Sequence, residues 1–105
     1  MKKSINYQDY LIESLKKPEE AVGYLNTALT GGNIKVFLLA LHNVVKAYGG
    51  IGQLAEKNHK SRTSLYKALS DKGNPYLKNI NEILSTLGMH FAIVPTRGQP
   101  TISKS

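Results

Sequence analysis

Residues 51–70 read IGQLAEKNHKSRTSLYKALS, and this stretch decides the predicted fold. Its apolar side chains recur at helical spacing in two short segments, about 51–58 and 61–70, with almost nothing between them. Ala55 supplies the small residue that lets a second helix cross close to the first, and Leu65 supplies an apolar anchor for that second helix. The stretch therefore predicts a helix-turn-helix, with two ordinary amphipathic helices as the alternative.

The polar side chains of the second segment gather on one predicted face. Residues four apart lie side by side on a helix. This spacing brings together Arg62, Thr63, Tyr66 and Lys67. In a DNA major groove, Arg62 would bind guanine through two hydrogen bonds, Thr63 would touch a thymine methyl group and Lys67 would reach guanine or phosphate. The full set of predicted DNA-binding residues is Gln53, Lys60, Ser61, Arg62, Thr63, Ser64, Tyr66, Lys67 and Lys78.

The excess positive charge lies past the first quarter of the chain. The net charge is +7, yet residues 1–30 hold four Lys against four acidic residues, whereas residues 31–105 hold ten basic residues against three acidic ones. Between Lys46 and Lys78 the sequence contains seven basic residues and two acidic ones. A basic centre behind a neutral first segment indicates one surface that attracts phosphate and another that need not. A merely Lys-rich, solvated surface is the alternative.

Four further helices are predicted around this stretch. A short one covers about Tyr7–Leu15, and a second starts at Pro18, a residue that suits the first helical position. A third, capped by Asn33, follows the three-four apolar spacing from Ile34 to Tyr48 without a miss. A last helix covers about Leu77–Leu87. Glycines follow the second, third and last of these helices, where they are expected to end them.

The residues after the last helix predict a short strand, HFAIV at 90–94, which Pro95 ends. This strand either pairs with its copy across a twofold axis or tucks against its own chain. The elements together predict an all-α, lambda-repressor-like helix-turn-helix domain of five to six helices with a short C-terminal strand. A single domain, 1–105, would comprise an N-terminal helical extension (1–32), a helix-turn-helix core (33–88), the strand (89–95) and a flexible tail (96–105).

The N-terminal helices have two interpretations. Residues 7–30 offer an amphipathic face to a protein partner, and a segment without net charge would not repel a basic one. The plainer alternative is that their apolar side chains simply extend the core of the domain. The residues concerned are Tyr7, Tyr10, Leu11, Leu15 and Leu25.

Composition argues against several classes of protein. The chain has no cysteine, which excludes disulfides and thiolate zinc sites, and no apolar run approaches the roughly 20 residues of a membrane helix. It opens without an apolar signal core, so we expect a cytoplasmic protein. His42, His59 and His90 are scattered, and no carboxylate lies at metal-ligand spacing from them. We therefore expect no enzyme activity, no metal and no cofactor.

One combination of motifs is specific: Leu65-Tyr66-Lys67-Ala68-Leu69-Ser70 followed by Gly73-Asn74-Pro75. With Gly49 to Glu56 before it and Leu84 to Gly88 after it, this combination resembles the HigA-type addiction-module antidote family. Members of that family are helix-turn-helix antitoxins. The resemblance covers about residues 7–94.

The turn between the two short helices departs from the family pattern. Where the family has a glycine and then an apolar residue, this chain has His59 and Lys60. Glycine there serves a left-handed turn, so His59 must either adopt a positive φ or sit in a different turn. Lys60 either loosens the turn or lies outward and adds a phosphate contact.

The resemblance implies an antitoxin that neutralises a small RelE/HigB-like toxin, typically an mRNA-cleaving enzyme encoded beside it. It also implies that the protein represses its own operon, as a homodimer on palindromic double-stranded DNA. Two alternatives remain from the residues themselves. One is a stand-alone helix-turn-helix transcriptional regulator without a toxin partner, and the other is a protein-interaction module without DNA binding.

Overall fold

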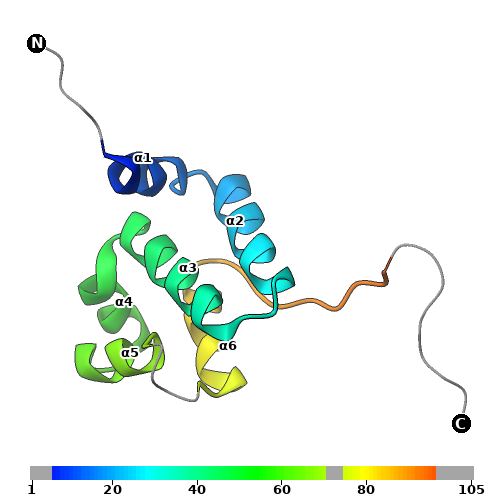
Figure 1. Ribbon diagram of the computed structural model, residues 1–105. Coiled ribbons are helices and arrows are strands. Elements are labelled where there is room, and N and C mark those ends of the chain that lie inside the picture. Colours follow the sequence, from blue (N-terminus) through cyan, green and yellow to red (C-terminus); the bar gives the residue numbers. More distant parts are fainter. Residues whose placement is uncertain (1–5, 71–74, 97–105) are drawn as a thin grey trace, which may run out of the picture.

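The computed structural model describes residues 6–70 and 75–96. Within these ranges the chain forms six α-helices and no strand (Figure 1). The helices are α1 (Tyr7–Ser14), α2 (Pro18–Thr30), α3 (Ile34–Ala47), α4 (Gly50–Asn58), α5 (Arg62–Ala68) and α6 (Leu77–Thr86). All six lie where the spacing of apolar residues predicts them, so the prediction of an all-helical chain with five to six helices is confirmed.

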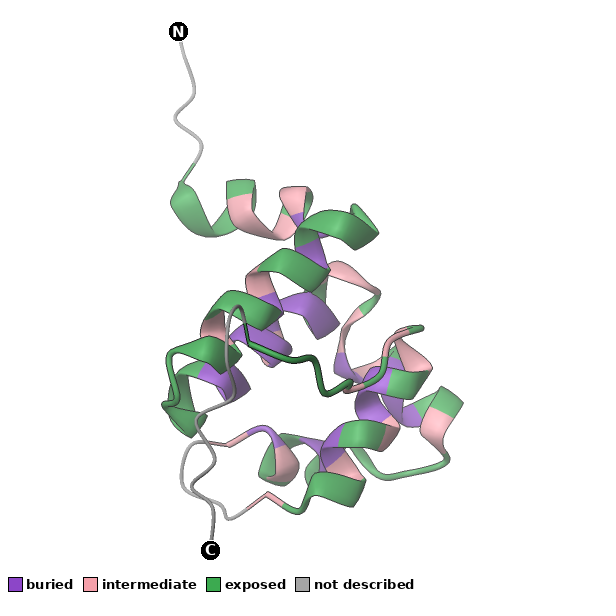
Figure 2. Cartoon of the chain, turned by 90° about the vertical axis from the view of Figure 1, so that its right-hand side faces the viewer, coloured by how far each residue is buried: buried purple, intermediate pink, exposed green. Residues whose placement is uncertain are grey.

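Helix α3 is the central element of the fold. The side chain of Asn33 caps it, because Oδ1 accepts hydrogen bonds from the backbone N–H groups of Lys35 (2.9 Å) and Val36 (3.3 Å). Helices α1, α2 and α4 all contact α3. Figure 2 shows the buried sides of the helices turned towards one another. The buried residues of α3 are Phe37, Leu38, Ala40, Leu41, Asn43, Val44 and Val45.

The remaining helices complete one continuous apolar cluster. Helix α4 contacts α5 and α6 as well as α3, and it buries Ile51 and Leu54. Leu65 and Leu69 come to the same cluster from α5 and its C-terminal end, and Ile83 comes from α6. Burial of this kind supplies most of the free energy that stabilises helices this short, because isolated helices of fewer than about 12 residues are marginal in water.

A buried polar residue joins the first two helices to α3. The side-chain amide of Asn43 accepts a hydrogen bond from Gln8 Nε2 (3.0 Å) and donates one to the hydroxyl of Tyr24 (2.9 Å). These partners lie on α1 and α2, and Asn43 is the only buried polar residue in the described part of the chain. Both ends of its amide are satisfied, as a buried amide requires. The N-terminal helices are therefore held on α3 by specific hydrogen bonds as well as by apolar contact.

The two interpretations of the N-terminal helices each account for part of their apolar side chains. Leu15 and Leu25 are buried in the core cluster, and Leu11 is partly buried against it. Tyr7 and Tyr10 are exposed instead. The core explanation is therefore right for the three leucines and wrong for the two tyrosines.

The predicted C-terminal strand does not form. Residues 89–96 have no regular structure, and no strand lies in the described residues to pair with them. The backbone N–H of Met89 bonds to the carbonyl of Leu84 (2.8 Å), and the ring of Phe91 packs on that of Phe37 with centroids 6.2 Å apart. An aromatic contact therefore holds the segment, because a strand needs a neighbouring ladder that residues 6–70 and 75–96 do not supply. The predicted turn at 71–75 and tail at 96–105 lie largely outside the described residues.

Taken singly, none of the helices in the described ranges is long and apolar enough to cross a membrane. Only α3 and α4 together reach that length and composition, and they are bent by 91° at their junction. Their apolar faces belong to the core cluster.

Candidate functional site

Helices α4 and α5 pack against each other across a turn of three residues, 59–61. Ala55 is buried where they approach, in agreement with the need for a small residue there. Leu65 and Leu69 point into the core. In Figure 1, the pair forms one end of the molecule, and α5 lies on its outside. The outer side of α5 is consequently open to a partner.

The turn is built on a left-handed residue. His59 has φ 55° and ψ 41°, and it is the only non-glycine residue with positive φ in the described chain. The next backbone N–H, that of Lys60, bonds back to the carbonyl of Ala55 (3.1 Å), as at other helix ends with a left-handed residue. Of the two possibilities predicted for His59, adoption of a positive φ is therefore correct.

Lys60 lies outward and is tied to another helix. Its Nζ atom is 3.2 Å from Oε1 of Glu82 on α6, and the side chain remains 37% exposed. The ion pair spans the turn and α6, so it holds the turn against the body of the fold. Surface pairs of this kind contribute about 0.2–1 kcal/mol. Lys60 keeps enough exposure to meet a phosphate, but it would have to leave Glu82 to do so.

Ser61 and Arg62 begin α5. The hydroxyl of Ser61 accepts a hydrogen bond from the backbone N–H of Ser64 (3.0 Å), which makes it the predicted N-cap. The guanidinium of Arg62 lies over α4 beside Gly52, where a Cβ atom would be 2.9 Å from its Nη2 atom. The absence of a side chain at Gly52 is thus what lets Arg62 rest there.

Tyr66 is exposed on the outer side of α5 and contacts α3. Its ring meets the imidazole of His42 edge-on, with centroids 6.0 Å apart. Burial lowers the pKa of His42, and the nearby charge of Lys46 lowers it further. A neutral imidazole therefore lies behind the predicted recognition helix at pH 7.

All nine residues predicted to bind DNA are exposed. Eight of them lie on α4, the turn or α5, whereas Lys78 lies in the first turn of α6. Sequence reasoning missed Gly52, His42 and Glu82, which support this surface. A glycine inside a helix is a recognised sign of close approach and could have pointed to Gly52. The other two had no such signal.

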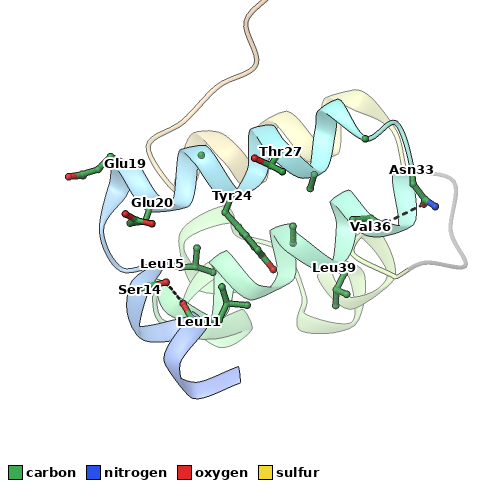
Figure 3. Close-up of a pocket in the computed structure, with 14 residues that line it drawn as sticks. Leu11, Ser14, Leu15, Glu19, Glu20, Tyr24, Thr27, Asn33, Val36 and Leu39 are labelled. Carbon is green, nitrogen blue, oxygen red and sulfur yellow. Dashed lines mark hydrogen bonds between the residues drawn. The ribbon is translucent and has the colours of Figure 1, made fainter. Parts of the chain in front are cut away.

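A second surface lies in the angle between α1, α2 and α3, and none of its lining residues belongs to α4 or α5 (Figure 3). It is a groove of about 700 Å³. Figure 3 shows Tyr24 reaching from α2 towards α3, with Leu11 and Leu15 at one end and Val36 towards the other. Its lining residues are Leu11, Ser14, Leu15, Glu19, Glu20, Gly23, Tyr24, Thr27, Ala28, Gly31, Asn33, Val36, Leu39 and Ala40.

In the ranges that the structure describes, no group of three or more histidine or acidic side chains lies close enough to hold a metal ion. The two surfaces thus offer exposed polar, basic and apolar side chains for binding. Neither presents a cluster typical of metal-assisted catalysis.

Comparison with known proteins assigns the family. A family described as "Probable addiction module antidote protein" matches residues 4–95, and the chain belongs to it. An uncharacterized protein of Haemophilus influenzae strain Rd is 35% identical over 85 residues, which cover 81% of this chain and 87% of the relative. No solved structure shows a significant match. Membership supports an antitoxin role, implies a toxin partner of some kind and favours a non-enzymatic, regulatory protein.

Proposed function

We propose that the protein is the antitoxin of a toxin–antitoxin module, that it neutralises a RelE/HigB-like toxin, and that it represses its own operon by sequence-specific DNA binding. Its α4–turn–α5 unit would act as a lambda-repressor-like helix-turn-helix. It would work in the cytoplasm, as a homodimer on a palindromic operator. The observation that carries the DNA-binding part is the exposed polar face of α5, which begins with Arg62 and ends with Lys67.

The chemistry of this face suits a DNA major groove. The N-terminal end of a recognition helix contacts base edges, and Arg62 and Thr63 occupy that end of α5. An arginine fork matches the two acceptors of guanine. Lys67 lies one turn later, and Gln53 is exposed near the start of α4, where it would meet the phosphate backbone.

The charge around this face favours a polyanion. Six basic residues of the described chain lie between Lys46 and Lys78, against Glu56 alone among acidic residues. Neutralising several phosphates releases counterions, so binding should weaken steeply as salt rises. The alternative of an ordinary solvated surface predicts no such dependence.

Co-purification tests the two parts of the proposal together. The chain alone would carry an affinity tag, and it would be expressed with the product of the neighbouring reading frame. The eluate would then be titrated with DNA of the shared promoter at two salt concentrations. We expect a stoichiometric small partner and promoter binding that weakens steeply at the higher salt concentration.

Other results would change the assignment. Promoter binding without a partner would instead support the stand-alone transcriptional regulator. A partner without promoter binding would leave the antitoxin and remove the repressor. If the eluate contained no partner and did not bind the promoter, both parts of the proposal would be overturned.

A further inference from the structure

The groove between α1, α2 and α3 combines an apolar floor with an acidic rim. Val36 and Leu39 line it and are 50% and 62% exposed. Large apolar side chains left this open on a central helix often mark a binding surface. Glu19 and Glu20 lie at its edge, and its lining contains no basic residue.

The two glutamates have no ion pair within the described part of the chain. By contrast, Glu13 is paired with Lys16 (3.1 Å), and Glu82 is paired with Lys60. Glu19 and Glu20 also lie in the first turn of α2, the end of the helix at which acidic side chains are commonly found. The rim therefore presents two negative charges that are available to a partner.

The charge of the rest of the molecule determines which partner fits. The chain carries a net charge of +7, and all of that excess follows residue 30. A basic partner would be repelled by the α4–α5 end and attracted to the Glu19–Glu20 rim. The groove thus offers a basic protein both opposite charge and apolar contact.

The surroundings of the groove determine the form of the partner. The described residues contain no strand, so a partner cannot add one to a sheet edge there. An amphipathic helix laid into an apolar groove is a common mode that needs no sheet edge. Helix α2 runs for 13 residues, or about 20 Å, which matches three to four turns of a bound helix.

We propose that this groove is the surface that binds the toxin, and that its occupant is an amphipathic helix with an apolar stripe and basic residues beside it. The inference rests on the antitoxin function proposed above and specifies where it operates. The apolar stripe would cover Val36, Leu39 and Tyr24, and the basic residues would pair with Glu19 and Glu20. DNA binding at α5 would remain free, because no residue of α4 or α5 lines the groove.

A matched pair of substitutions on α3 tests the groove. Val36→Lys places a positive charge inside it, whereas Ile34→Lys places the same charge just outside, at a side chain that is also 50% exposed. Calorimetric titration would use the full chain and the purified product of the neighbouring reading frame. We expect Val36→Lys and Leu39→Lys each to weaken binding at least about 30-fold, as at an interface hot spot, and Ile34→Lys to change it less than about 3-fold.

Charge reversal tests the rim. A Glu19→Lys/Glu20→Lys variant should bind at least about tenfold more weakly, and its affinity should depend less on salt. Glu13→Lys is the control, because Glu13 does not line the groove. All variants should still unfold in one cooperative thermal transition and bind the promoter, which shows that they fold.

The outcomes separate this inference from the function on which it rests. If the parent chain binds no product of the neighbouring frame, both the toxin partner and the groove proposal are overturned. If the parent binds it and the Lys variants bind equally tightly, the antitoxin stands and the groove proposal is wrong. If Leu39→Lys instead converts a dimer to a monomer without weakening the partner complex, the groove joins two copies of the chain, which also overturns the proposal.

Discussion

The guanidinium of Arg62 on α5 rests over Gly52 on α4. A Cβ atom at Gly52 would lie 2.9 Å from Nη2 and 3.3 Å from Cζ of Arg62, so any larger residue at position 52 displaces the guanidinium. The backbone at Gly52 does not require glycine, because its φ is not positive. Glycine at position 52 therefore leaves the space in which the guanidinium rests, and it determines where the first polar side chain of α5 lies.

Gly52→Ala should separate stability from DNA binding. Alanine is better than glycine inside a helix by about 1 kcal/mol, so the free energy of unfolding should stay the same or rise. Operator binding should weaken, by no more than the roughly 1–3 kcal/mol expected for loss of the Arg62 contact. Chemical denaturation and fluorescence anisotropy with operator DNA measure the two effects.

Two further variants control this experiment. Gly23→Ala on α2 meets nothing within 4 Å, so it should stabilise its helix without affecting DNA binding. The double variant Gly52→Ala/Arg62→Ala should bind DNA like Arg62→Ala alone, since both changes act through one guanidinium. Fully additive losses would show that Gly52 does not position Arg62.

Asn43→Ala should destabilise the attachment of the N-terminal helices. It removes the hydrogen bonds to Gln8 and Tyr24, and an intramolecular hydrogen bond contributes about 0.5–1.5 kcal/mol to stability. Urea unfolding measures the loss. Asn26→Ala is the control, because Asn26 is exposed and its side chain has no hydrogen bond in the described part of the chain. Equal stability of the two variants would show that the Asn43 network contributes nothing.

His59→Gly should stabilise the protein. A left-handed conformation strains an L-residue by roughly 1–2 kcal/mol, and glycine relieves most of this at the cost of greater freedom in the unfolded chain. We expect a net gain of about 0.5–1 kcal/mol in the free energy of unfolding by thermal or urea denaturation. His59→Ala should bring no such gain. A destabilised glycine variant would mean that the imidazole itself holds the turn.

Acidification should weaken the fold through His42. Its pKa is lowered in the folded chain, by burial first and by Lys46 second, so the unfolded chain binds the proton more readily. Stability is therefore lost as the pH falls from about 6.5, the ordinary value, through the lowered one. His42→Gln should flatten this part of the stability–pH curve, whereas His90→Gln, at an exposed site, should leave it unchanged. Identical curves for all three proteins would contradict the assignment.

Local patterns predicted the helices and their caps. The apolar spacing was sufficient to predict α3, because the apolar residues on the buried face of a helix recur every three or four positions. Pro18, Asn33 and Ser61 marked three helix starts, since the groups that cap a helix lie next to it in sequence. The prediction for residues 90–94 was wrong because it also used only local sequence. A run of apolar residues has the pattern of a strand, but it forms one only where a partner strand lies beside it.

Contacts between distant residues could not be predicted in this way. Lys60 meets Glu82, and His42 meets Tyr66, across 22 and 24 positions of the chain. Neither pair has a sequence period or a motif. The first depends on how the turn after α4 lies against α6, and the second depends on how α5 lies against α3. The groove likewise exists only where α1 and α2 fold back on α3. Sequence thus predicted which residues of α5 are exposed, and the packing showed what holds them in place.

The central claim is that α5 reads DNA sequence, and titration of the operator with Arg62→Ala and Lys78→Ala tests it most directly. Fluorescence anisotropy would compare the parent operator with single-base variants, at two salt concentrations. We predict that Arg62→Ala costs about 1–3 kcal/mol and relaxes base choice at one position, whereas Lys78→Ala weakens binding evenly across sequences. If Arg62→Ala bound every site as tightly as the parent, α5 would not be the recognition helix.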